Sequence, residues 1–271
     1  MMVLTGRTAL VHGGGGAVGG AVARAFAAAG ARVHLAGRSR ARLEAVADEI
    51  GDAAVVADVD ALDGRAVADH ADAVAAAEGG IDIALNAVSF PFVHDRAFAE
   101  VSVEEVLHPI ERHLRTNLVT AKAVAPHMAA RGAGTILTLS AAASRIGTPG
   151  SLGYGTACAA IETLTQRLAV ELGPSGVRVA CLRSHLIADG PAHGSPTGEL
   201  FARRAAAAGV DVAQLPADVT LLGRLPTLAQ VGAAAVFVAS DGAAAITGAV
   251  LDLTCGSAVR TATGSVVGVL D

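Results

Sequence analysis

The stretch from Thr8 to Phe26 places the strongest constraint on how this chain can fold. It reads Thr-Ala-Leu-Val-His-Gly-Gly-Gly-Gly-Ala-Val-Gly-Gly-Ala-Val-Ala-Arg-Ala-Phe. A short apolar run ends in four glycines, and apolar residues follow at helical spacing, at Val18, Val22 and Phe26. This pattern predicts a strand, a tight glycine turn and a helix.

A glycine turn between a strand and a helix is a candidate phosphate site. Glycine backbone can adopt positive φ, lets a pyrophosphate approach the main chain, and leaves the N–H groups of the helix N-terminus facing an anion. A flexible loop is the alternative interpretation of a glycine run. The dinucleotide interpretation predicts cofactor-binding roles for Gly13, Gly15, Gly16, Val18 and Gly19.

Strand and helix patterns alternate along the rest of the chain. Apolar runs predict strands over 31–36, 53–57, 81–85, 135–140, 177–182 and 249–253, and helical periodicity predicts helices over 39–50, 63–77, about 102–130, 151–172 and 229–239. Ser102 and Glu105 have the spacing of a capping box, and Pro109 and Pro126 predict a break or bend in the helix that follows. Regular alternation of this kind is typical of a parallel doubly wound sheet.

Length and composition exclude several classes of protein. With 271 residues, of which 52% are hydrophobic, the chain can bury a large core, and we expect one domain over 1–271. The net charge of −5 and the lack of a basic run predict no nucleic-acid partner. No apolar run reaches membrane-spanning length and no leader pattern precedes the first strand, so we expect a cytoplasmic protein without a membrane partner.

Cysteine and histidine spacing predicts no metal site. The three cysteines are widely separated, which also argues against a disulfide framework, and the nine histidines form no HExxH motif. His108 and His113 are interpreted as part of a solvated helix face.

Three polar residues stand where a dinucleotide fold contacts its cofactor or substrate. Arg38 follows the second predicted strand, where a guanidinium suits a 2′-phosphate; a loop arginine in water is the alternative. Asp58, followed by Val59, ends the third strand and could accept a hydrogen bond from an adenine amino group. Asn117 stands inside a predicted helix, where asparagine is unfavourable. Its presence therefore needs a reason, which is either structural or functional.

The region from 187 to 226 breaks the regular alternation with four prolines. A long irregular insertion near the carboxyl edge of a parallel sheet predicts a substrate lid there. Five apolar residues are candidates for its lining, or for sealing the lid against the domain: Leu200, Phe201, Leu215, Leu221 and Leu222. We expect a glycine-rich cofactor half over 1–130 and a catalytic half over 131–271.

Taken together, the chain resembles the short-chain dehydrogenase/reductase family over nearly its full length. The matching landmarks are Gly13, Gly19, Asp58-Val59, Asn86-Ala87, Asn117, Tyr154 and Ile246-Thr247-Gly248. The resemblance implies an α/β fold, with a Rossmann-like, three-layer, doubly wound sheet of seven parallel strands and helices on both faces. It also implies a nicotinamide cofactor, bound in part by Asn86 and Ala87, and a homotetramer or dimer. The turn at Arg38 looks like that of members that prefer NADP(H) over NAD(H).

The departures from the family pattern concern the catalytic residues. The family's catalytic serine falls on Ala141, its catalytic lysine on Cys158, and Ser140 is expected to point to the opposite face of the strand. The resemblance implies that Tyr154 is the proton donor and that Asn117 positions a water or the main chain. Without a nearby cation, Tyr154 can still donate a proton but is a poor base near neutral pH. His185 is interpreted either as a group that compensates for the lost serine and lysine or as a solvent-exposed histidine. Cys158 is interpreted as an inert packing residue.

The leading hypothesis is an NADP(H)-dependent oxidoreductase that acts on a carbonyl or hydroxyl of a hydrophobic small molecule. Two alternatives stay open. One is a non-redox enzyme on the same scaffold, such as a dehydratase, isomerase or cyclase, and the other is a catalytically inactive cofactor-binding protein.

Overall fold

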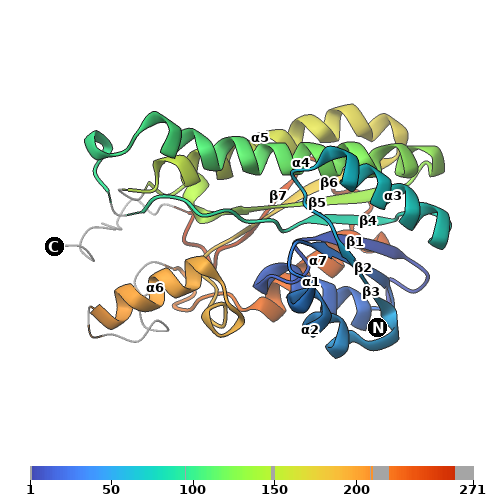
Figure 1. Cartoon of the computed structure of the whole chain (residues 1–271), viewed down its shortest axis with the longest axis horizontal. Helices are drawn as coiled ribbons and strands as arrows, with labels where there is room; N and C mark the ends of the chain where they lie inside the picture. Colours follow the sequence, from blue (N-terminus) through green and yellow to red (C-terminus); the bar gives the residue numbers. More distant parts are fainter. Residues whose placement is uncertain (1, 95, 148–149, 208, 210–219, 260–271) are drawn as a thin grey trace.

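Seven parallel strands form one sheet in the computed structural model, which describes residues 2–94, 96–147, 150–207, 209 and 220–259 (Figure 1). The strands are β1 (Thr8–His12), β2 (Arg32–Gly37), β3 (Ala54–Asp58), β4 (Ile83–Asn86), β5 (Gly134–Ala141), β6 (Val177–Ser184) and β7 (Val250–Leu253). Their order is β3-β2-β1-β4-β5-β6-β7, and every neighbouring pair is parallel. The predicted doubly wound seven-stranded fold is confirmed.

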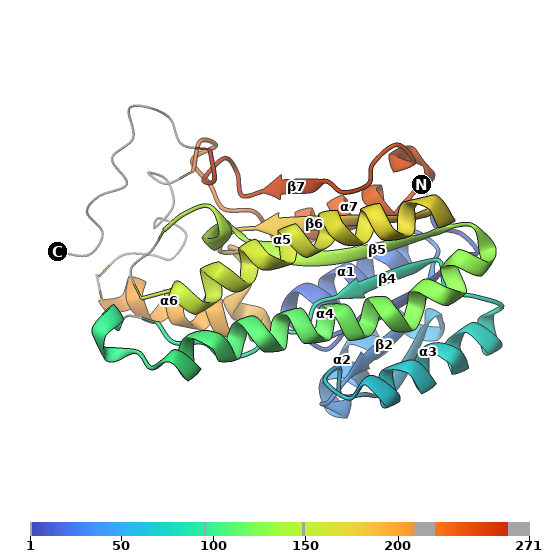
Figure 2. The same ribbon diagram turned by 90° about the horizontal axis from the view of Figure 1, so that it is seen from above.

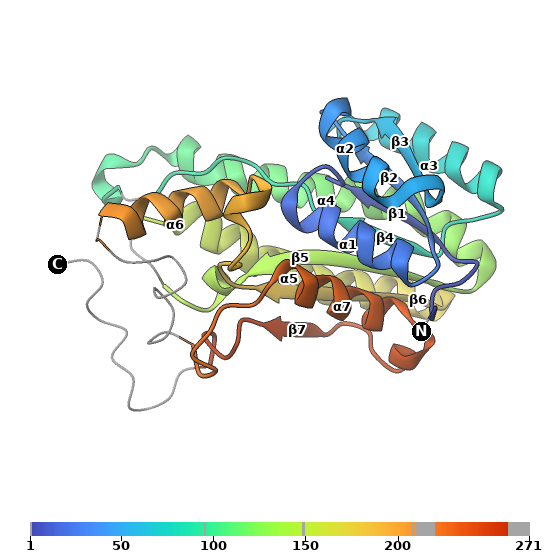
Figure 3. The same cartoon turned by 90° about the horizontal axis from the view of Figure 1, so that it is seen from below.

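Helices cover both faces of the sheet. They are α1 (Ala17–Ala28), α2 (Arg40–Ile50), α3 (Gly64–Glu78), α4 (Val103–Arg131), α5 (Leu152–Leu172), α6 (Pro196–Ala207) and α7 (Leu228–Ala239). Helices α3, α4 and α5 lie on one face (Figure 2), and α1, α2 and α7 lie on the other (Figure 3). Helix α6 lies beyond the sheet, in the region of the predicted lid. Residues 208 and 210–219 of that lid, including Leu215, are outside the described part of the chain.

The alternation of side chains along each strand divides the core into two layers. In β1, Val11 packs toward α1 and α7, whereas Leu10 packs toward α3 and α4. Because both faces are covered, the strands are buried runs of mostly apolar residues rather than alternating ones.

Helix α4 begins as predicted and differs from the prediction in its interior. The Ser102 hydroxyl accepts from the Glu105 N–H and the Glu105 carboxylate accepts from the Ser102 N–H, which completes the capping box. The helix then continues through Pro109 and Pro126 without a break. Its buried face packs against α3, α5 and the sheet, and tertiary packing of this kind supplies most of a helix's stability.

The strand order reverses between β1 and β4, which are neighbours in the sheet although β2 and β3 intervene in the sequence. Ligands of open parallel sheets bind outside the carboxyl ends of the strands at such a switch point. The glycine turn follows β1 and the segment Asn86-Ala87 ends β4, so both lie at this point. Among the described residues, no helix is long and apolar enough to cross a membrane.

Candidate active site

The glycine turn is shaped by contacts that leave no room for side chains. Gly13 has a φ of +79°, and a Cβ there would lie 2.7 Å from the carbonyl group of Ala87. A Cβ on Gly19 would lie 2.2 Å from the Gly13 carbonyl oxygen, so α1 approaches the turn at backbone contact distance. The segment after β4 and the start of α1 therefore close against the turn only because both positions are glycine.

The N-terminus of α1 is open to an anion. Gly16 is the N-cap, it is exposed, and no side chain caps the first N–H groups of the helix. The first turn contains no acidic residue, and Val18 is half-exposed on it. Unpaired N–H groups and the helix dipole together favour a bound phosphate, so the turn fits a dinucleotide pyrophosphate.

Arg38 and Asp58 lie at the ends of neighbouring strands, where the adenosine half of a dinucleotide is expected. Arg38 is exposed in the turn after β2. The Asp58 carboxylate is 3.4 Å from the Arg40 guanidinium, whose other partner is Glu44. Val59 is buried in the core layer under α3, and its N–H donates to the Gly37 carbonyl. At this edge, Arg38 is the exposed cation that follows β2 directly.

Asn86 and Ala87 form the wall beside the glycine turn. The Asn86 amide donates to the Thr120 hydroxyl and its carbonyl oxygen accepts from the Val88 N–H. The Ala87 N–H donates to the His12 carbonyl. The side chain of Asn86 is thus engaged inside the protein, and it holds the backbone of Ala87 against Gly13.

Tyr154, Cys158 and Ala141 come together at the start of α5. The Tyr154 hydroxyl and the Cys158 thiol lie close enough to shift each other's pKa, and the thiol also lies close to the main chain of Ala141. Burial, with a smaller contribution from Cys158, raises the pKa of Tyr154 well above its ordinary value. Burial also raises the pKa of Cys158 to about 11, so the thiol is protonated at neutral pH. The interpretation of Cys158 as an inert packing residue agrees with this environment.

Asn117 has one polar atom that the described residues leave without a partner. The Asn117 amide donates to the His113 carbonyl at 2.8 Å, while the buried Oδ1 finds no partner in this part of the chain. A buried acceptor of this kind calls for a donor such as water or a ligand group. The prediction that His113 lies on a solvated face is wrong, because its side chain is only 6% exposed and its Nδ1 bonds the Pro109 carbonyl.

A buried ionic network lies one helical turn beyond Cys158, and sequence reasoning missed it. Glu162 of α5 accepts from Ser140 at 2.6 Å, from Ser144 at 2.5 Å, and from two nitrogens of Arg183. Arg183 also reaches Asp252, 3.2 Å away. Burial opposes the charge of Glu162, but hydrogen bonds from Arg183 and Ser140 outweigh it and keep the pKa of Glu162 below its ordinary value.

This network engages the hydroxyl of Ser140, so Ser140 is not free to act as the serine that the family resemblance places at Ala141. The Ser140 hydroxyl is held by Glu162 on the face of β5 that packs on α5, as the strand alternation predicts. The sequence signal for the network was available: Glu162 follows Tyr154 and Cys158 at four-residue spacing, and Arg183 stands in a buried strand. Charged residues in such places usually have a buried partner.

His185 follows β6 and is half-buried. Burial lowers the pKa of His185, although Asp252 opposes this shift. Its Nδ1 accepts from the N–H of Leu186, so one ring nitrogen is engaged by its own backbone.

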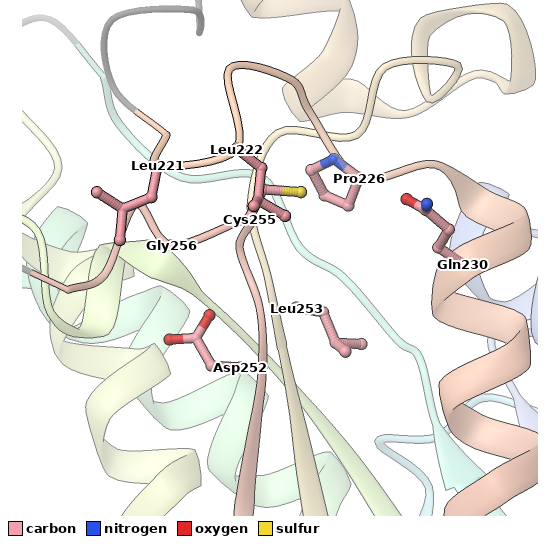
Figure 4. Close-up of a pocket in the computed structure, with 8 residues that line it drawn as sticks. All are labelled: Leu221, Leu222, Pro226, Gln230, Asp252, Leu253, Cys255 and Gly256. Atoms are coloured by element: carbon pink, nitrogen blue, oxygen red, sulfur yellow. The ribbon is translucent and has the colours of Figure 1, made fainter.

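Two cavities lie near this edge of the molecule. One, of about 490 Å³, is lined by Leu221, Leu222, Pro226, Gln230, Asp252, Leu253, Cys255 and Gly256 (Figure 4). The other, of about 530 Å³, lies between the start of α4 and the loop after β5, with Arg96, Pro109, Ser144 and Gly153 in its lining. Tyr154 lines neither of the two. Within the described ranges, no group of three or more His, Cys, Asp or Glu side chains could hold a metal ion.

Comparison with known proteins identifies the family. A family model described as enoyl-(acyl carrier protein) reductase matches residues 15–258. The chain is 35% identical over 189 residues to the probable galactose dehydrogenase of Rhizobium meliloti strain 1021, which covers 68% of this chain and 73% of that protein. It is 34% identical over 177 residues to the L-xylulose reductase of Bos taurus, covering 65% and 70% of the two chains.

The fold is also shared with solved structures. A short chain dehydrogenase/reductase family protein superposes with a TM-score of 0.79 at 30% identity, covering 95% of this chain and 100% of the other. The chain therefore belongs to the short-chain dehydrogenase/reductase family of NAD(P)-binding oxidoreductases.

Proposed function

We propose that this protein is an NADP(H)-dependent reductase of a carbonyl group on a hydrophobic small molecule, with Tyr154 as the proton donor. One observation carries the proposal: Tyr154 is the ionisable hydroxyl at the carboxyl edge of the sheet, and its surroundings keep it protonated. A phenol with a raised pKa is a proton donor and a poor proton acceptor near neutral pH. The arrangement therefore favours reduction over alcohol oxidation.

The residues around the switch point fit a dinucleotide. Gly13, Gly15, Gly16, Val18 and Gly19 would hold the pyrophosphate, because the turn is free of side chains and ends at an uncapped helix N-terminus. Arg38 would meet the 2′-phosphate that distinguishes NADP(H), and Asp58 and Val59 would meet the adenine. Asn86 and Ala87 would form the wall toward the nicotinamide. When bound, a reduced nicotinamide supplies the hydride.

The protein's own contribution is a neutral site. Tyr154 Oη holds the proton that the substrate oxygen receives, and Ala141 offers that oxygen no second hydroxyl donor. Cys158 stands where a cation would lower the pKa of the tyrosine, and its protonated thiol cannot do so. Asn117 Oδ1 is left to accept from a water behind the site.

Ala141 and Cys158 also support a second candidate, a family member that binds the cofactor without redox catalysis. Neither residue can orient or polarise a carbonyl, and in the family both positions carry polar residues. The substitution Ala141→Ser, which restores the serine of the family pattern, distinguishes the two candidate functions. A large gain in carbonyl reduction supports a weakened reductase, and no gain supports a site used for something else.

The proposal is tested with Tyr154→Phe, which keeps the ring and removes the proton. With a panel of aliphatic, aromatic and conjugated carbonyl compounds, wild type should oxidise NADPH, and the variant should lose about 10²- to 10⁴-fold in kcat while NADPH affinity stays unchanged. Equal turnover by the variant would exclude Tyr154 as the proton donor.

A further inference from the structure

One flat face of Tyr154 is covered by a phenylalanine. The rings of Phe92 and Tyr154 are stacked, with centroids 3.9 Å apart and an interplanar angle of 5°. His94 adds a third ring, 4.1 Å from Phe92 and tilted by 55°. This contact accounts for the absence of Tyr154 from the lining of either cavity.

The two sides of the stack are held very differently. Tyr154 is fixed on α5 between two close contacts, since a Cβ on Gly153 would lie 2.7 Å from the Val106 carbonyl oxygen and one on Gly155 would lie 2.9 Å from the Ala143 carbonyl oxygen. Phe92 is half-buried and stands in the irregular segment between β4 and α4. A ligand that needs this face would therefore displace Phe92, in the irregular segment, rather than Tyr154, on the closely packed start of α5.

The chemistry of the site independently restricts the substrate. A simple ketone becomes an alkoxide on hydride addition, and this strongly basic oxygen needs good donors. Among the described residues at the reacting position, Tyr154 supplies the hydroxyl, with Ala141 and the Cys158 thiol beside it. A quinone needs much less help, because its reduced form is a phenolate whose pKa is about that of tyrosine, near 10.

We propose that Phe92 occupies the place of the substrate, and that the substrate is a planar conjugated carbonyl compound of the quinone type that stacks on Tyr154. This inference rests on the proposed reductase function. The quinone takes up a hydride and a proton to become the hydroquinone. The hydride with its electron pair comes from the reduced nicotinamide, which is oxidised, and the proton comes from Tyr154 Oη, which water reprotonates.

The test measures binding, without cofactor, of 2,3-dimethyl-1,4-naphthoquinone, whose substituted ring does not add thiols. Calorimetry gives Kd, and the emission of Tyr154, the chain's single tyrosine, reports where the ligand stacks because there is no tryptophan. The saturated ketone 1-decalone, of similar size, serves as the control ligand.

We expect the quinone to bind, to quench Tyr154, and to bind more tightly than decalone. Phe92→Ala should tighten quinone binding by about 2- to 10-fold, because the ligand no longer competes with a stacked ring. Phe237→Ala is the matched control, since this phenylalanine lies on α7 and is 47% exposed, and it should change nothing. Tyr154→Phe keeps the ring and should keep the affinity.

Weaker or unchanged quinone binding in Phe92→Ala would overturn the displacement, and equal affinity for decalone would overturn the preference for planar rings. The failure of this inference is distinct from that of the proposed function. A protein that binds NADPH but no quinone contradicts only the substrate class, and one that binds the quinone but no NADPH contradicts only the reductase.

Discussion

Tyr154 can be titrated directly, because the chain has one tyrosine and no tryptophan. We expect absorbance near 295 nm to show a phenol pKa well above its ordinary value, since burial disfavours the phenolate and no cationic side chain of the described residues offsets this effect. Cys158→Lys should lower this pKa by roughly 1–3 units, and Cys158→Ala should not. A wild-type tyrosine that titrates near 10 would contradict an uncharged site around this half-buried phenol.

His12 makes the fold sensitive to acid. Its side chain is 1% exposed, neither ring nitrogen has a partner among the described residues, and burial, with a smaller effect of His70, lowers its pKa to about 3. A group whose pKa is depressed on folding contributes stability above its unfolded pKa of 6.5, and that stability is lost as the pH falls toward 3.

Urea unfolding at pH 7 and pH 5 measures this effect. Proton binding by His12 of the unfolded chain should cost the wild type about 2 kcal/mol between these values. Over the same interval, His12→Leu should lose about 2 kcal/mol less stability than the wild type. His108 is exposed, so His108→Leu should behave like the wild type. An identical pH dependence of wild type and His12→Leu would show that His12 is not buried uncharged.

At the scale of elements, Glu162 and Arg183 join α5 to β6 behind the site. Removing one partner leaves the other buried charge without its main counterion: among the described residues, Arg183 keeps only Asp252, and Glu162 keeps the hydroxyls of Ser140 and Ser144 and the more distant Arg145. Glu162→Ala or Arg183→Ala should each cost about 3 kcal/mol in the free energy of unfolding. The double variant should cost clearly less than the sum. Additive losses in urea denaturation would contradict a coupled pair.

The packing of α1 on the glycine turn makes a second prediction at this scale. Gly19→Ala places a Cβ against the Gly13 carbonyl and should move α1 away from the turn, with lower thermal stability and loss of NADPH affinity. Gly64→Ala is the matched control, because the nearest atom to its Cβ, on Val119, is 3.9 Å away. Equal NADPH affinity of both variants would mean that the turn does not hold the cofactor.

Local pattern predicted most elements because each is specified by neighbouring residues. The glycine turn, the capping box at Ser102 and the buried strands depend on spacing within a few positions. Spacing could show that Glu162 and Arg183 are buried, but their pairing 21 residues apart depends on tertiary contacts, which the sequence pattern does not encode. The same holds for the Phe92–Tyr154 stack. The break predicted at Pro109 or Pro126 is wrong for the same reason, since α4 continues through both and its packing outweighs the local cost of the prolines.

At the scale of the whole molecule, the parallel sheet brings the ends of β1, β4, β5 and β6 to one edge. The resemblance to the family predicted this topology, and the structure confirms it. The division into a cofactor half over 1–130 and a catalytic half over 131–271 stays a prediction, as do the homotetramer or dimer, the cytoplasmic location and the role of each site residue. This edge carries a side-chain-free glycine turn, which we propose as the phosphate site, and the uncharged group of Tyr154, Cys158 and Ala141, which we propose as the catalytic position.

The most direct test of the account is a titration of the purified protein with NADPH and with NADH, followed by the fluorescence of the cofactor itself. We expect NADPH to bind more tightly than NADH. Arg38→Ala should weaken NADPH binding by about tenfold or more and change NADH binding little, because a charge-assisted bond to the 2′-phosphate is lost. Arg167→Ala, an exposed arginine on α5, is the control and should bind both cofactors like wild type. Binding of neither cofactor would contradict the central claim, and equal loss of both in Arg38→Ala would contradict the phosphate assignment.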